Sequence, residues 1–121
     1  MKTFVNCSNH PSVNWSDSQK AAAEKYGKIV DVPFPAVATN LSDAQLQELA
    51  EKTTEAIIDK NPEVVMCMGE FVVCFRIVQK LKAKGICVLA SCTERQAVEY
   101  IEDDGTVRKQ TIFVFQGFRE Y

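Results

Sequence analysis

The feature that most constrains the fold is a pair of continuous apolar runs, Val64–Met68 and Ile86–Ala90, separated by a stretch with helical periodicity. Strands with one face in water alternate apolar and polar residues, whereas strands that are apolar throughout are typical of a parallel sheet covered on both faces. Between the two runs, residues 71–84 predict a helix that Gly85 ends, because glycine is favoured just after a helix. Its expected core stripe is Phe71, Cys74, Phe75, Val78 and Leu81.

The residues before this unit repeat the alternation of strand and helix. Lys2–Asn6 and Ile29–Val32 have the pattern of strands. A short helix is expected between them, beginning after Ser16, which stands at capping-box spacing from Gln19. A second helix is expected after Ser42, with an apolar stripe along one face: Leu46, Leu49, Ala50, Thr53 and Ile57.

The C-terminal part has a different pattern. Residues 96–102 and 107–115 alternate around Asp103-Asp104-Gly105-Thr106, which predicts a β-hairpin. The order is therefore βαβαβαβ followed by a hairpin. It predicts one α/β domain over residues 1–121, a small Rossmann-like fold with a mostly parallel sheet, helices on both faces and a C-terminal β-hairpin. A length of 121 residues suits a single domain.

The composition indicates in which cellular compartment the protein is expected. No apolar run approaches the ~20 residues of a membrane span, so no membrane partner is expected. The first residues turn polar too early for a signal peptide. None of the five cysteines forms a C-x-x-C pair, and two lie in apolar strand-like runs, which indicates reduced thiols in a cytoplasmic protein.

The net charge and the missing motifs argue against several classes of ligand and enzyme. A net charge of −2 argues against broad binding to duplex nucleic acid but leaves room for a compact anionic ligand. No metal site or cofactor is expected, because His10 is the only histidine and no cysteine cluster has zinc spacing. The glycine-rich and nucleophile motifs of dinucleotide oxidoreductases, P-loop NTPases and α/β-hydrolases are missing too.

The expected fold also says where a ligand would bind. In open α/β sheets, ligands bind beyond the carboxyl ends of the strands. This rule selects four segments, which are expected to be loops: Cys7–Trp15, Pro33–Thr39, Gly69–Phe71 and Ser91–Arg95. They carry small hydroxyls, helix-start amides and one arginine, which are groups that a phosphate-bearing ligand needs.

Each candidate residue also has a structural interpretation. His10 could simply hydrogen-bond its own turn, and Trp15 is better explained as a hydrophobic staple than as a stacking platform. Glu70 suits the first turn of a helix because of the helix dipole. Arg95 could form only a surface pair with Glu94. These interpretations and the functional ones stay open at this point.

The apolar residues of the helix at residues 71–84 indicate contact with a second protein surface. Val72, Val73 and Ile77 are apolar in addition to the expected core stripe, so the helix has a second apolar face that needs cover. A homodimer through this helix would supply that cover. The alternative is burial under the chain's own hairpin.

Several segments together resemble a known group of proteins. They are NCSNHPS, DVPFP, VVMCMGEF, SCTER and FQGFREY, in this order along nearly the whole chain. This chain resembles small single-domain CRISPR-associated proteins related to the ring nucleases of the CARF (CRISPR-associated Rossmann fold) families. It departs from their pattern at Met68, where Gln is expected before the glycine.

The resemblance implies binding of a cyclic oligoadenylate second messenger, above all cyclic tetra-adenylate, across a dimer cleft. It also implies metal-independent cleavage by the ligand's own ribose 2′-hydroxyl, which would switch off type III CRISPR signalling. His10 and Arg95 would then be catalytic. The residues implied to contact the ligand are Ser8, Asn9, Gly69, Glu70, Phe71, Ser91 and Thr93.

Two other functions fit the same residues. One is a sensor or sponge that holds the messenger without cutting it. The other is a nucleoside deoxyribosyltransferase-like enzyme with Glu70 as the nucleophile. Products distinguish the three, because a nuclease releases linear di-adenylates, a sponge returns intact ligand and a transferase releases free base.

Overall fold

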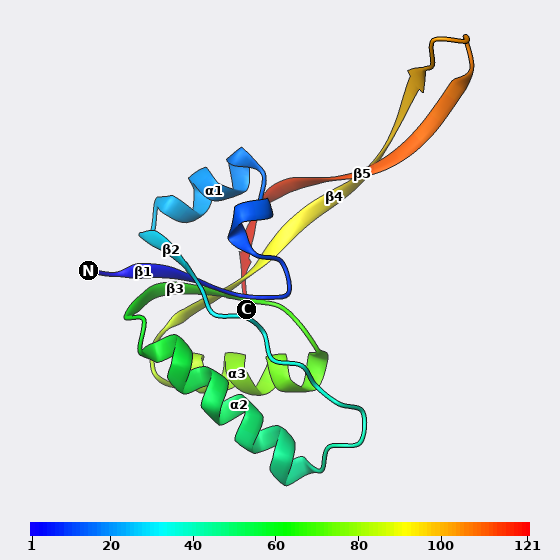
Figure 1. The fold of residues 1–121 in the computed structure, drawn as a ribbon. Coiled ribbons are helices and arrows are strands. Elements are labelled where there is room, and N and C mark those ends of the chain that lie inside the picture. The colour runs from blue at the N-terminus through cyan, green and yellow to red at the C-terminus, as the bar shows by residue number, and fades with distance from the viewer.

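The computed structural model describes residues 1–121 as an α/β protein with one five-stranded mixed sheet and three α-helices (Figure 1). None of the helices has the length and apolar character needed to cross a membrane. The elements follow one another as β1 (Thr3–Cys7), the 3-10 helix η1 (Ser12–Asn14), α1 (Asp17–Glu24), β2 (Lys28–Asp31), α2 (Asp43–Ile58), β3 (Pro62–Cys67), α3 (Phe71–Ala83), β4 (Cys87–Ile101) and β5 (Val107–Glu120).

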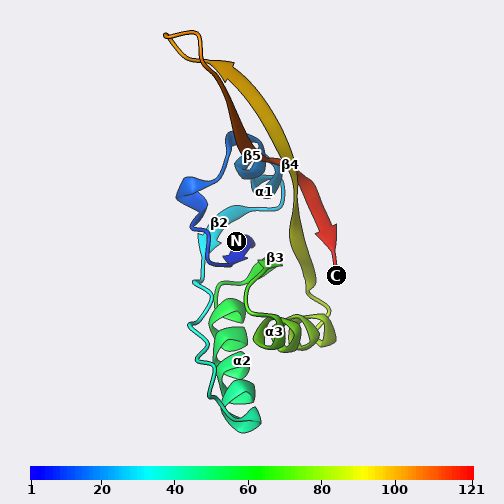
Figure 2. The same cartoon turned by 90° about the vertical axis from the view of Figure 1, so that its right-hand side faces the viewer.

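The strand order is β2-β1-β3-β4-β5. The first three pairings in this order are parallel, and β4 pairs with β5 in the antiparallel direction. In both views α1 lies on one side of the sheet, and α2 and α3 lie on the other (Figures 1 and 2). The predicted α/β class and the antiparallel C-terminal pair are confirmed.

The core is divided by the sheet into two clusters. Val5 and Val65 belong to the cluster that α2 and α3 cover, whereas their neighbours Phe4 and Val64 belong to the cluster with Trp15 on the α1 side. Alternate residues of one strand therefore enter opposite cores. This explains why apolar residues stand next to each other in both strands, as Phe4 and Val5 do in β1 and Val64 and Val65 do in β3.

The helices begin where their capping residues predict. Ser16 accepts a hydrogen bond from the Gln19 amide before α1. At α2 both bonds of a capping box form, because Ser42 accepts from the Gln45 amide while the Gln45 side chain accepts from the Ser42 amide. Gln19 does not return the bond, since its side-chain amide lies 3.9 Å from the sulfur of Met66.

The prediction that Ser91–Arg95 forms a loop is wrong. These residues lie inside β4, which runs without interruption from the body of the sheet into the hairpin. The reason is that β5 pairs with β4 over its length, from Leu89 opposite Glu120 to Ile101 opposite Val107. The strand therefore continues after its parallel partner β3 has ended, and the two strands leave the body as a long ribbon (Figure 1).

The predicted core face of α3 is wrong in part. Cys74, Val78 and Leu81 are buried as expected, but Phe71 is 89% exposed and Phe75 is 62% exposed. Val73 and Ile77, assigned to the second face, are fully buried in the core and cannot form a contact with another copy. Because the first turns of the helix are apolar on all sides, its rotation is decided by packing on the sheet and on α2.

Candidate functional site

The loop after β1 and the base of the hairpin face each other across a cavity of about 600 Å³. Five predicted site residues that are far apart in the sequence line this cavity, namely Ser8, Asn9, His10, Ser91 and Thr93. The carboxyl end of β3 contributes the wall between them, through Met66 and Met68. The cavity therefore lies at the carboxyl ends of the parallel strands, as sheets of this kind predict.

His10 has a fixed backbone and a free ring. Its carbonyl accepts hydrogen bonds from Asn6 Nδ2 at 2.9 Å and from Trp15 Nε1 at 3.1 Å, and its amide donates to Ser8 Oγ at 3.2 Å. All the hydrogen bonds that His10 makes with the protein come from its backbone, and the residue lines the cavity. The backbone, not the ring, therefore braces this turn.

A buried polar network holds the loop in place. Ser8 Oγ donates to Asn6 Oδ1 at 2.7 Å, and Asn6 Nδ2 also donates to Asp31 Oδ1 at 3.1 Å. The other oxygen of Asp31 accepts from the Ser12 amide at 3.1 Å. Asn6 and Ser8 are almost fully buried, so their hydrogen bonds are made within the protein. Ser8 is accordingly a positioning residue.

Sequence analysis did not identify Asn6 and Asp31. The signal was present, because Asn6 directly follows the apolar residues Phe4 and Val5 in a strand, and a buried polar side chain needs partners. Its partner could not be found without the register, in which Asn6 lies opposite Asp31 across β1 and β2.

Ser91 has two hydrogen-bond donors, its amide and its hydroxyl, that share one weak acceptor. Its amide and its hydroxyl both point at the thioether sulfur of Met68, at 3.2 and 3.3 Å. A thioether is a weak acceptor, so the oxygen of a ligand would be the stronger partner for both groups. Ser91 lines the cavity, where such an oxygen could reach it.

Arg95 does not line the cavity, but it lies next to a residue that does. Side chains on a strand alternate, so Arg95 shares a face of β4 with Ser91 and Thr93. Directly opposite Arg95 on β5 is Phe113, which lines the cavity and is 70% exposed. Arg95 is therefore placed beside the outer end of the cavity.

Phe113 extends an aromatic row from the core into the hairpin. Trp15 packs on Phe4, Phe4 packs on Phe118, and Phe118 packs on Phe115, with ring centroids 6.1, 5.3 and 5.0 Å apart. Trp15 is buried in this row and packs on Phe4, so it is not an open stacking platform. Sequence analysis missed Phe113, although its alternation with Phe115 indicates one face of a strand.

Gly69, Glu70 and Phe71 lie outside this cavity. The carboxylate of Glu70 caps α3 and accepts from the amides of Val72 and Val73 at 2.9 and 2.8 Å. It fills the position where a phosphate would bind a helix N-terminus. Gly69 is required by packing, because a Cβ there would lie 2.6 Å from the ring of Phe34.

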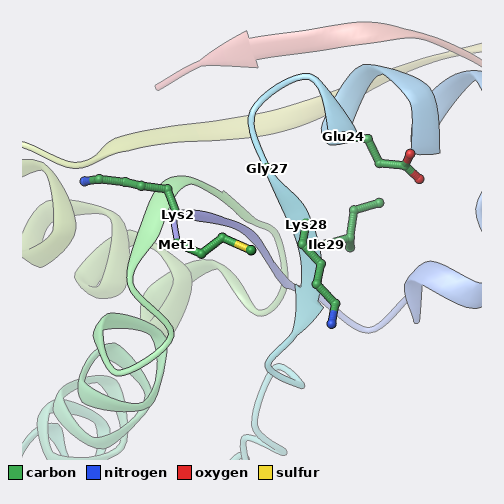
Figure 3. Close-up of a pocket in the computed structure, with 6 residues that line it drawn as sticks. All are labelled: Met1, Lys2, Glu24, Gly27, Lys28 and Ile29. Atoms are coloured by element: carbon green, nitrogen blue, oxygen red, sulfur yellow. The ribbon is translucent and has the colours of Figure 1, made fainter.

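Two further hollows lie near the strand ends. One, on the β2 side of the loop, is lined by residues that include Asn9, Asp31 and Pro33. The other lies at the amino ends of β1 and β2, where the charged ends of Lys2 and Lys28 point away from each other (Figure 3). Neither brings together as many predicted residues as the cavity at His10. No cluster of three or more His, Cys, Asp or Glu side chains is arranged to hold a metal ion.

Residues 2–119 match the model of one family, described as "Uncharacterized protein MJ1673 family". No curated protein and no solved structure matches the chain.

Proposed function

We propose that this chain, which belongs to the MJ1673 family, binds a cyclic oligoadenylate in the cavity between the β1 loop and the hairpin and opens its ring. One observation carries the proposal. His10 makes its hydrogen bonds with the protein through its backbone alone and lines a cavity together with Ser91 and Thr93. An imidazole without a protein partner, beside hydroxyl donors, suits acid–base chemistry on a phosphodiester.

The surrounding residues match the parts of a nucleotide. Adenine needs an aromatic surface, and Phe113 offers an exposed ring, for which stacking contributes about 1–3 kcal/mol per base. The phosphate needs donors, which Ser91 supplies through its amide and hydroxyl. Arg95 adds a permanent positive charge beside Phe113. Asn9 and Thr93 complete the polar lining.

The proposed reaction uses a nucleophile from the ligand. The ribose 2′-hydroxyl gives its proton to water as its oxygen attacks the adjacent phosphorus, and the bond from phosphorus to the 5′-oxygen breaks, leaving a 2′,3′-cyclic phosphate. His10 protonates the departing 5′-oxygen, and Arg95 stabilises the charge that develops on the phosphate. The protein's main contribution is to hold the in-line geometry.

Cyclic tetra-adenylate is the proposed substrate, which the protein removes in the cytoplasm to end type III CRISPR signalling. The proposed homodimer forms through α3, on the side of the sheet opposite to the cavity. The exposed residues of α3 that a second copy would cover are Phe71, Val72 and Phe75. They form a contiguous apolar patch of the kind that marks protein interfaces. This set replaces the one expected from the sequence, which included the buried Val73 and Ile77.

A panel of cyclic oligoadenylates incubated with the protein in excess chelator tests the proposal. From cyclic tetra-adenylate we expect linear di-adenylates with 2′,3′-cyclic phosphate ends. The His10→Ala variant should lose cleavage, while Val13→Ala should behave as the parent, because Val13 is exposed in the same loop but does not line the cavity. Intact bound ligand would identify a sponge, and absence of binding to any ring would refute the proposal.

A further inference from the structure

Another hollow lies on the opposite side of the sheet from the His10 cavity, along α3. It is an open groove of about 920 Å³, with Phe71, Phe75 and Tyr121 among its walls. Cys74 is the cysteine that lines it and is 7% exposed. The groove therefore gives small molecules a route to the Cys74 thiol.

Beneath this groove, Cys74 is in contact with a second thiol. The sulfur atoms of Cys67 and Cys74 lie 3.7 Å apart, and both cysteines are free. The Tyr121 hydroxyl lies 3.8 Å from the Cys74 sulfur and donates to the Cys67 carbonyl at 2.7 Å. The C-terminal residue thus holds the pair from the side of the groove.

The environment of the two thiols differs. Hydrogen bonds with the Cys67 thiol, which has the largest effect, with the Tyr121 hydroxyl and with the Gly69 backbone lower the pKa of Cys74 to about 7, against the opposing effects of burial and of the Glu70 carboxylate. Cys74 also lies in the first turns of α3, where the helix dipole favours a thiolate. Contacts with Cys7 and Cys74 raise the pKa of Cys67, and its burial adds to the effect.

We propose that Cys74 is a nucleophilic modification site, which peroxides entering the α3 groove oxidise and which Cys67 then resolves as a disulfide. In the first step the Cys74 thiolate attacks a peroxide oxygen and the O–O bond breaks. For hydrogen peroxide, the leaving hydroxide takes up a proton as water, and Cys74 becomes a sulfenic acid. In the second step the Cys67 sulfur attacks the Cys74 sulfur. The hydroxyl group leaves with the Cys67 proton as water, so two thiols are oxidised and one peroxide is reduced to two waters.

The geometry suits the second step. A disulfide has sulfur atoms about 2.05 Å apart, so the pair must close by about 1.7 Å from its present 3.7 Å. Cys74 lies in the first turns of α3, and Cys67 is the last residue of β3, next to the short connection between them. Thiol exchange with a reducing agent restores both cysteines, as expected for a transient disulfide in a reducing compartment.

Intact-mass measurement and peptide mapping of the dilute protein after hydrogen peroxide treatment test this proposal. Dilution keeps a second copy from covering α3. We expect the loss of two hydrogens, a Cys67–Cys74 cross-link, and reversal by dithiothreitol. In Cys67→Ser, dimedone should label Cys74, because the sulfenic acid cannot be resolved. Cys92→Ser serves as the control and should react as the parent, because Cys92 lies on β4, away from the groove.

Two measurements keep the test independent of altered folding in the variants. In the parent, the oxidation rate should rise with a midpoint at a pH of about 7, and in Tyr121→Phe the midpoint should move to higher pH. Circular dichroism checks that each variant is folded. The proposal is overturned if the folded parent forms no Cys67–Cys74 cross-link, or if dimedone labels Cys87 or Cys92 faster than Cys74 in Cys67→Ser.

Discussion

At the scale of single residues, the site separates groups that hold the loop from groups that are free to react. The side chains of Asn6 and Ser8 form hydrogen bonds within the protein. The His10 ring has no hydrogen-bond partner in the protein, the Ser91 donors have only a weak acceptor, and both residues line the cavity. Substitutions of the two kinds should therefore have different consequences. Those in the network should affect folding, and those at the cavity should affect ligand chemistry.

His10→Ala should slow single-turnover cleavage by about 10²–10⁴-fold, the range typical of a general acid, and change ligand affinity far less. Its melting temperature should match that of the parent, because the ring makes no hydrogen bond with the protein. Both quantities are measured on one preparation. An unchanged rate with a lowered melting temperature would show that the ring is structural.

Asn6→Ala should lower the stability of the protein, unlike His10→Ala. It removes the acceptor of the buried Ser8 hydroxyl and one of the donors to the His10 carbonyl, at a cost of about 1–3 kcal/mol of unfolding free energy. Chemical denaturation measures this loss, and Asn40→Ala, at an exposed position in another loop, is the control. Equal stability of the two variants would contradict the role of the network.

At the scale of elements, α3 is the segment for which local pattern and structure disagree most. Val73→Ser should destabilise the protein by about 1–3 kcal/mol, because it places a hydroxyl in a fully buried apolar site. Phe75→Ser should leave stability nearly unchanged and reduce self-association, because Phe75 is exposed. Chemical denaturation measures the change in stability, and light scattering measures self-association. A parent that is monomeric at micromolar concentration would exclude the dimer.

The thiol pair gives the same helix a pH dependence. Because the pKa of Cys74 is lowered to about 7 in the folded state, the unfolded chain binds more protons between pH 7 and 9. Unfolding free energy should therefore rise with pH in this window by roughly 1–3 kcal/mol, and Cys74→Ser should remove the rise. The raised pKa values of Cys67 and Tyr121 act above this window, where they lower stability. Denaturation at several pH values checks the slope.

The elements also show what a sequence can and cannot predict. Ser16 and Ser42 mark helix starts because a cap depends only on residues three positions away. The face of α3 and the continuity of β4 depend on distant partners, namely the sheet and β5. The cavity was found in part, since the carboxyl-end rule selects His10 and Ser91. Phe113 and Asp31 were missed because their roles depend on register.

At the scale of the whole molecule, the cavity uses only the base of the hairpin. Replacing residues 98–110 by Asn-Gly would keep Arg95 opposite Phe113 and Ala97 opposite Thr111. We expect unchanged ligand binding and an unfolding free energy within about 0.5 kcal/mol of the parent, because the outer arm is largely exposed. Titration and denaturation measure both. A loss of binding would assign the arm a part in the site.

The position of β1 has a consequence for synthesis. This first strand lies between β2 and β3, yet β3 begins only at Pro62 and the arm that borders β4 comes last. A chain leaving the ribosome from its N-terminus therefore leaves one edge of β1, with its backbone N–H and C=O groups, unpaired until β3 has been made. During that interval the nascent protein is most open to chaperones and to aggregation, and the cavity forms only after β5 has emerged.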